Sequence, residues 1–251
     1  MKTPAQQQNI VQSLIAARLS GQPCAVDTAH PDLSLDDAYA IQAGVAKALD
    51  WFPDHHPTAW KVGGTTVITA APLPEVWHSP AQWTPASDDE VLIEAELAFR
   101  LGATPARPED AQACLASVCV SIEVIGTRLA NGLDAPAAWK LADQGVHAGL
   151  IIGPETPYAA CAGFTMDYWR QQDCRVIVNG QLLKQVQGAH PGVNPLTTLP
   201  WLVDHAARHT GGLKAGDLIT TGAWTVATVR RGEQVEVAFD GFGSARLLFC
   251  H

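Results

Sequence analysis

Residues 91–99 read Val91-Leu92-Ile93-Glu94-Ala95-Glu96-Leu97-Ala98-Phe99. The alternation extends over residues 90–101 and predicts a β-strand. Residues two apart in a strand share a face, so Glu94 and Glu96 point the same way. Two neighbouring carboxylates on an otherwise apolar strand repel each other and cost desolvation energy unless a cation lies between them. The alternative at this stage is a half-exposed strand whose solvated face carries two ordinary glutamates.

A third carboxylate, Glu123, interrupts another apolar run at residues 118–125. A glutamate in the middle of so apolar a strand needs a partner. Three oxygen ligands from two strands, with no Cys or His at ligand spacing, favour a hard divalent cation such as Mg²⁺ or Mn²⁺. The competing interpretation is an ion pair between Glu123 and either Arg128 or Arg100.

Lys61 ends a short apolar strand and is followed by the turn Gly63-Gly64-Thr65-Thr66. Such a turn is able to bring backbone N–H groups and two hydroxyls close to an anion. A lysine at this position can hold a carboxylate or, if desolvated, transfer a proton. An exposed lysine at the end of a strand is the simpler alternative.

The first 55 residues have a helical pattern. Thr3 and Pro4 suit a helix start, and apolar residues recur at helical spacing up to Leu19. Ser34 and Asp37 form a capping-box pattern that opens a second helix, which ends before Pro53. We therefore expect an N-terminal helical arm over residues 1–55.

The rest of the chain, residues 56–251, reads as a β-rich body with a few helices. Asn179-Gly180 predicts a hairpin, Asn194-Pro195 is expected to start a helix that Gly211-Gly212 closes, and a short helix opens near Pro108. Further strands are expected at 59–62, 118–125, 147–152, 218–220, 235–239 and 245–249. The predicted fold class is α+β.

Composition limits the function classes. The 251 residues are 47% hydrophobic and only 16% charged, with a formal net charge of −9. The scattered basic residues make nucleic acid and anionic membrane poor partners. No apolar run is long enough to span a membrane, and the N-terminus lacks the apolar segment of a signal peptide. The six cysteines form no CxxC pair, which favours a cytoplasmic location.

Four motifs occur in an order that resembles one known family. They are Trp60-Lys61-Val62-Gly63-Gly64-Thr65-Thr66, Ile93-Glu94-Ala95-Glu96-Leu97-Ala98, Ser121-Ile122-Glu123-Val124-Ile125 with Arg128, and Leu213-Lys214-Ala215-Gly216-Asp217-Leu218-Ile219-Thr220-Thr221-Gly222. The sequence resembles the 2-keto-4-pentenoate hydratases, which with the 4-oxalocrotonate decarboxylases belong to the fumarylacetoacetate hydrolase superfamily. The resemblance runs from about residue 34 to residue 249.

The resemblance implies a mixed β-roll or β-sandwich body with an N-terminal helical region, assembled as a homo-oligomer. It implies a hydro-lyase that adds water to a short 2-hydroxy-2,4-dienoate or 2-oxo-3-enoate in aromatic-compound catabolism. The implied residues fall into three groups: metal ligands Glu94, Glu96 and Glu123; proton-transfer residues Lys61, Asp143 and Glu75; and substrate-binding residues Gly63, Thr65, Thr66, Gln144, Thr221 and Gly222.

Departures from the family pattern keep other activities open. Hydrolases of the superfamily usually carry a histidine two positions before the first metal glutamate, where this chain has Leu92. Hydratases commonly have Asp where this chain has Gly126, and Asn where it has Gln144. The alternatives are a 4-oxalocrotonate-type 2-oxo acid decarboxylase, an acylpyruvate-type C–C hydrolase, and a catalytically silent subunit that associates with a partner decarboxylase or hydratase.

Overall fold

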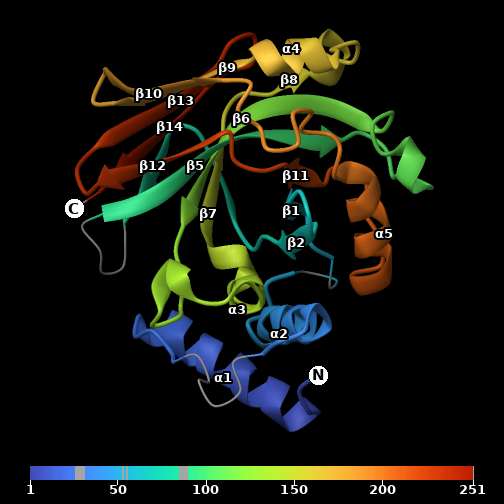
Figure 1. Cartoon of the computed structure of the whole chain (residues 1–251), viewed down its shortest axis with the longest axis vertical. Helices are drawn as coiled ribbons and strands as arrows, with labels where there is room; N and C mark the ends of the chain where they lie inside the picture. Colours follow the sequence, from blue (N-terminus) through green and yellow to red (C-terminus); the bar gives the residue numbers. More distant parts are fainter. Residues whose placement is uncertain (26–31, 53, 55, 85–89, 251) are drawn as a thin grey trace.

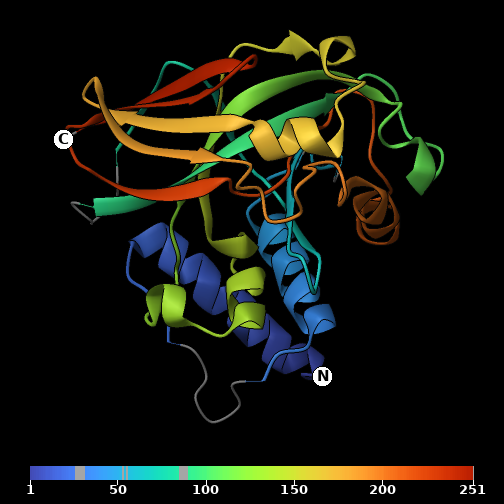
Figure 2. The same ribbon diagram turned by 45° about the horizontal axis from the view of Figure 1, so that its top comes forward.

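Two curled β-sheets form the body of the molecule, and helices close one end of it (Figures 1 and 2). The computed structural model describes residues 1–25, 32–52, 54, 56–84 and 90–250. The α-helices are α1 (Pro4–Ser20), α2 (Leu35–Ala48), α3 (Ala137–Ala142), α4 (Met166–Gln171) and α5 (Leu199–His209). Short 3₁₀ turns are η2 (Pro108–Asp110), η3 (Gly132–Asp134), η4 (Gln144–Val146) and η5 (Tyr158–Ala160). The predicted α+β class is confirmed.

The larger sheet carries the predicted site. Its strands are β1 (Ala59–Gly63), β2 (Thr69–Pro72), β3 (Val76–His78), β5 (Glu90–Leu101), β6 (Leu115–Ile125), β7 (His147–Ile152), β8 (Thr156–Pro157), β11 (Leu218–Thr220) and β12 (Thr225–Arg230). They run in the order β2-β1-β11-β5-β6-β7-β3, with β12 paired to β5 and β8 to β6. The long antiparallel pair β5–β6 is therefore central.

The smaller sheet lies against β6. Its strands are β4 (Ala81–Trp83), β9 (Asp173–Val178), β10 (Gln181–Gln187), β13 (Gln234–Phe239) and β14 (Gly243–Phe249), in the order β10-β9-β13-β14-β4. Alternate residues of β6, β13 and β14 point into one apolar core, including Val120, Ile122, Val237 and Leu247. Packing of the two inner faces places one side of β6 in this core.

Several predicted elements are confirmed. Asn179 and Gly180 both adopt positive φ angles, 51° and 77°, and join β9 to β10 as a tight hairpin. The helix expected to start at Asn194-Pro195 begins later, at Leu199. The reason is local: the Asn194 side chain accepts a hydrogen bond from the Leu196 N–H, which satisfies the backbone as a turn before the helix starts.

Capping boxes start both helices of the N-terminal arm, as the sequence predicts for α2. Asp37 also accepts hydrogen bonds from the Lys2 backbone N–H and the Gln7 side chain, which tie α2 to α1. Burial alone would raise the pKa of Asp37, but these hydrogen bonds and those from Ser34 lower it to about 2. None of the described helices is both long and apolar enough to cross a membrane.

The helical arm shares its hydrophobic core with a later part of the chain. Val11 and Ile41 belong to the same buried cluster as Leu129, Trp139 and Leu141, which lie in and before α3. Both views show α3 beside the helices of the arm (Figures 1 and 2). The division at residue 55 stays a prediction about domains, while the packing joins residues from both sides of it.

Helix α5 packs its buried face, which includes Leu202 and Ala206, against the larger core. His205 on this face is 3% exposed and stacks on Trp201, with a ring-centroid distance of 4.7 Å. Tyr39 of α2 lies 4.5 Å from the same imidazole ring. Burial, followed by the nearby His209 and Arg208, lowers the pKa of His205 to about 4.

We predict that His205 makes the fold sensitive to acid. The unfolded chain binds a proton at His205 below about pH 6.5, whereas the folded chain does so only near pH 4. The free energy of unfolding should therefore fall as the pH drops through this window. In His205→Phe, urea unfolding at pH 7, 6, 5 and 4.5 should show a shallower loss than the wild-type protein. Identical pH slopes would contradict the prediction.

Candidate metal centre and its cavity

Three glutamate carboxylates converge on neighbouring strands. Glu94 and Glu96 share one face of β5, and Glu94 lies directly opposite Glu123 in the antiparallel pairing with β6. One oxygen from each of the three lies within 4.8 Å of the other two. Glu96 and Glu123 are buried, and the Glu94 side chain is about one quarter exposed. The solvated-face interpretation of the Glu94 and Glu96 pair is therefore wrong.

Lys61 supplies the positive charge nearest to this cluster. Its Nζ lies 2.6 Å from Glu123 Oε1 and 4.0 Å from Glu94 Oε2, and it donates to the Gly145 carbonyl at 3.1 Å. Burial would lower the pKa of Lys61, but attraction to the three glutamates raises it above its usual value. Lys61 is therefore a protonated ammonium at neutral pH.

The partner of Glu123 is Lys61 and not one of the two arginines considered from the sequence. Arg100 pairs with Glu155, and Arg128 pairs with Asp143. His147 is a second partner, with Nδ1 3.0 Å from Glu123 Oε1.

The pKa shifts of the three glutamates indicate that the cluster carries more negative charge than its neighbours balance. Burial, and then repulsion from Glu123 and Glu94, raises the pKa of Glu96 well above its usual value. Burial also raises the pKa of Glu94. The pKa of Glu123 is lowered in spite of burial, because Lys61 and His147 stabilise its charge. Its Oε2 atom is buried without a hydrogen-bond partner.

A cavity of about 840 Å³ opens from the cluster. Lys61, Glu94 and Glu96 line it at one end, together with the backbone of Gly63 and Gly222. Most of the remaining wall is apolar and comes from several elements, including Leu35, Val67, Leu92, Ile125, Leu133, Leu141, Val146 and Val226. The cavity thus joins a charged end to an apolar chamber, as small-molecule sites usually do.

The loop after β11 borders the charged end. The Gly222 N–H donates to Glu96 Oε2 at 3.3 Å, and the Thr221 hydroxyl donates to the Leu97 carbonyl. Gly222 has a φ of 109°, a conformation that favours glycine. His190 Nε2 lies 2.9 Å from the Thr221 carbonyl. Gly222 therefore lies at the carboxylate cluster, whereas the Thr221 hydroxyl is hydrogen-bonded to the backbone of β5.

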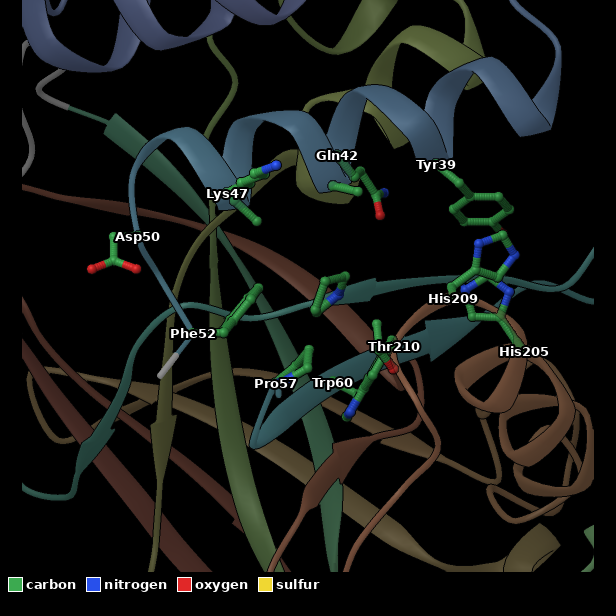
Figure 3. Close-up of a pocket in the computed structure, with 13 residues that line it drawn as sticks. Tyr39, Gln42, Lys47, Asp50, Phe52, Pro57, Trp60, His205, His209 and Thr210 are labelled. Atoms are coloured by element: carbon green, nitrogen blue, oxygen red, sulfur yellow. The ribbon is translucent and has the colours of Figure 1, made fainter. Parts of the chain in front are cut away.

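A smaller cavity of about 220 Å³ lies between α2, α5 and β1 (Figure 3). Tyr39, Gln42 and Lys47 line it from α2, and His205 lines it from α5. None of the predicted site residues lines it. Trp60, which also lines this cavity, directly precedes Lys61 in β1. Because neighbouring residues of a strand point to opposite faces, the indole points away from the carboxylate cluster.

Comparison with known families agrees with the geometry. Residues 43–247 match the family described as fumarylacetoacetate (FAA) hydrolase C-terminal. The chain belongs to the FAA hydrolase family. Two curated relatives are each 27% identical to this chain and cover 98% of it and 96% of their own length: 2-keto-4-pentenoate hydratase from Paraburkholderia xenovorans (strain LB400) and 2-keto-4-pentenoate hydratase 3 from Pseudomonas putida.

Solved structures show the same fold. 4-Oxalocrotonate decarboxylase from Pseudomonas putida G7, complexed with magnesium and adipate, superposes with a TM-score of 0.83 at 20% identity, covering 99% of both chains. Fumarylpyruvate hydrolase from Pseudomonas aeruginosa, in complex with Mn²⁺ and pyruvate, gives a TM-score of 0.54 at 16% identity, covering 78% of this chain and 90% of that one. The resemblance drawn from the sequence motifs is confirmed.

Some predicted residues of this FAA hydrolase family member do not meet at the cluster. Glu75 is exposed between β2 and β3 and does not line the cavity. Gln144 is buried and donates to the Pro72 carbonyl. Thr65 borders an adjoining cavity of about 400 Å³ that shares Gly63 and Gly222 with the main one, and Thr66 is exposed beyond both.

Asp143 is buried beneath the cavity, where it forms an ion pair. Arg128 Nε lies 2.5 Å from Asp143 Oδ1, and the Arg128 backbone N–H and the Thr127 hydroxyl donate to Oδ2. The remaining Arg128 nitrogens donate to three backbone carbonyls, those of Gly126, Asp143 and His147. The structure therefore does not bring Asp143 together with Lys61, and gives it the geometry of a structural anchor.

His147 is not among the site residues predicted from the sequence, yet it contacts the cluster. It is 2% exposed and contacts Glu123. Burial lowers the pKa of His147, and the neighbouring Glu123 opposes this only in part. The available signal was a polar residue opening the apolar run His147-Ala148-Gly149-Leu150-Ile151-Ile152, but that run does not reveal which face the imidazole takes.

We predict that Asp143→Asn destabilises the protein by about 3 kcal/mol, because removal of one partner leaves the buried guanidinium of Arg128 without its counter-charge. Urea unfolding at pH 7 measures this change. The control is Asp110→Asn, which breaks an exposed pair with Arg107 and should cost less than about 1 kcal/mol. Equal losses in the two variants would show that Asp143 is not an anchor.

Proposed function

We propose that this chain is a divalent-metal-dependent hydro-lyase that adds water to a short 2-hydroxy-2,4-dienoate or 2-oxo-3-enoate, a step in the breakdown of aromatic compounds. The observation that carries the proposal is the cluster of three glutamates, two of them buried, with Lys61 at its edge and a largely apolar cavity beside it. The names of the full-length curated relatives, both 2-keto-4-pentenoate hydratases, support the reaction class.

Glu94, Glu96 and Glu123 would hold the cation, which we propose to be Mg²⁺ or Mn²⁺. The donor set is all oxygen, as these hard cations prefer. Glu123 Oε2 is buried without a partner, and the raised pKa of Glu96 marks a carboxylate that lacks a counter-charge. When bound, the cation supplies Lewis-acid polarisation of the 2-oxygen of a chelating 2-oxo acid.

The protein's own groups perform the remaining tasks. Lys61 places a charged ammonium at the mouth of the cluster, where it can bind the substrate carboxylate or donate a proton to carbon during tautomerisation. The Gly145 carbonyl and Glu123 fix its position. The apolar wall can pack against the hydrocarbon part of the substrate.

The lining of the cavity also bears on the alternatives. Leu92 shares its strand face with Glu94 and lines the cavity, and its apolar side chain supplies no base for activating water in C–C hydrolysis.

A decarboxylase remains the second candidate on one observation. Lys140 also lines the cavity, and a second cation is what a dicarboxylate requires. The structural relative named 4-oxalocrotonate decarboxylase was solved with adipate, a dicarboxylate.

We also propose that the enzyme works in the cytoplasm as a homo-oligomer, able to associate with a partner decarboxylase or hydratase. All six cysteines are free thiols, which suits a reducing compartment. Because the three glutamates and Lys61 are in place, a silent subunit is the less favoured interpretation.

Removal of one carboxylate tests the metal site. Glu94→Gln should weaken Mn²⁺ binding more than about tenfold, because affinity for hard cations depends on the number of charged ligands. Electron paramagnetic resonance of free Mn²⁺ measures the dissociation constant. Glu90→Gln is a matched control on the same strand, where Glu90 pairs with Arg230 at the surface. Equal affinity in all three proteins would contradict the proposed ligands.

The reaction is tested with 2-hydroxypenta-2,4-dienoate and 2-oxohex-3-enedioate in the presence of Mg²⁺ or Mn²⁺. A hydratase consumes the first, seen as loss of dienol absorbance, whereas a decarboxylase releases CO₂ from the second. In Lys61→Met, kcat should fall by about 10²-fold or more, as expected for loss of a proton-transfer group, while Mn²⁺ binding persists. A wild-type rate in this variant would remove Lys61 from the mechanism.

A further inference from the structure

His147 lies in contact with the glutamate cluster, but it does not line the cavity. Its imidazole is 2% exposed, and Nδ1 lies 3.0 Å from Glu123 Oε1. A carboxylate can only accept from an imidazole N–H, so the proton of this hydrogen bond belongs to Nδ1. Nε2 is buried without a hydrogen-bond partner. Buried polar atoms are normally hydrogen-bonded, so the unpaired Nε2 is unfavourable and the presence of a histidine here needs an explanation.

A β-bulge turns His147 toward the cluster. In the pairing of β6 with β7, Glu123 lies opposite Leu150 and Val124 opposite Gly149, but Ile125 lies opposite His147, so Ala148 is an extra residue. Paired residues share a face, so the bulge places His147 on the face of Glu123. Without it, His147 would take the opposite face.

Gly126 allows the bulge to form. A Cβ atom at Gly126 would lie 2.9 Å from the Cβ of Ala148, the extra residue, which is closer than side chains tolerate. The Gly126 N–H also bonds to the Val146 carbonyl at 2.9 Å, just before the bulge. The glycine that departs from the hydratase pattern is therefore the one that the His147 geometry needs.

The two hydrogen-bond donors meet on the same oxygen of Glu123. Lys61 Nζ, at 2.6 Å, and His147 Nδ1 both contact Oε1. The other oxygen, Oε2, has no partner. A carboxylate held in this way offers one oxygen to a cation and keeps the second away from it.

We propose that His147 is a positioning residue that, with Lys61, holds Glu123 so that only Oε2 binds the cation. This inference rests on the proposed metal site and adds a role for a residue outside the cavity. Hydrogen-bond partners of metal-binding carboxylates fix both the orientation and the affinity of the ligand. A free Oε1 would instead let Glu123 chelate the cation with both oxygens and displace a bound water.

The test compares Mn²⁺ binding in wild-type protein, His147→Leu, His147→Asn and His205→Leu. His147→Leu should weaken binding by about 10- to 100-fold, as loss of such a partner commonly does. His147→Asn should restore most of the affinity, because its amide nitrogen takes the place of Nδ1. His205→Leu removes a buried histidine that lines the smaller cavity and should bind like wild type. Water-proton relaxation of the Mn²⁺ complex should show fewer exchangeable waters in His147→Leu.

Wild-type affinity and hydration in a folded His147→Leu would overturn the positioning role and leave the metal site standing. Failure of the wild-type protein to bind Mn²⁺ would overturn the metal site itself and this inference with it. If His147→Leu does not fold, nuclear magnetic resonance of ¹⁵N-histidine wild-type protein decides. The Nδ1–H signal of His147 should persist when Mg²⁺ is added, and its conversion to an Nε2–H signal would overturn the role.

Discussion

The convergence of three carboxylates on adjacent strands, two of them buried, is the constraint on which the site depends. Glu94 and Glu123 are direct cross-strand neighbours, and Glu96 is fully enclosed. The single positive charge of Lys61 does not balance the three carboxylates. A proton or a bound cation must supply the remaining positive charge, which agrees with the raised pKa of Glu96. The elements around the cluster each serve this need: β1 carries the ammonium, the loop after β11 donates an N–H to Glu96, and β7 contributes an imidazole.

Much of the central sheet and of the carboxylate cluster could be predicted from periodicity. Alternation over residues 90–101 placed Glu94 and Glu96 on one face, and the apolar surroundings of Glu123 required a partner for it. The partner itself could not be predicted, because it depends on strand register, which a single sequence does not contain. The partner of Asp143 could not be predicted for the same reason: an aspartate beside a recognisable motif gives no sign that Arg128 occupies its oxygens. A one-residue bulge reverses the face of a side chain and leaves no trace in the hydrophobic pattern.

The helical arm also acts on the site. Its core includes residues of α3 and of the segment before it, so the arm packs against the element from which Leu141 lines the cavity. Arg18 of α1 lies 3.7 Å from Asp143, which joins the arm to the ion pair below the site. Sequence periodicity marked the arm as separate because its helices precede all strands, whereas the hydrophobic cluster forms only when a segment about a hundred residues later folds onto it.

Strand β1 is a partition between two chambers. Trp60 lines the smaller cavity (Figure 3). Its neighbour Lys61 lines the larger one. Successive residues of a strand point to opposite faces, so one short backbone segment carries the indole on one side and the ammonium on the other. The place of Lys61 beside Glu123 and the contact of Trp60 with His205 of α5 therefore rest on the same short strand.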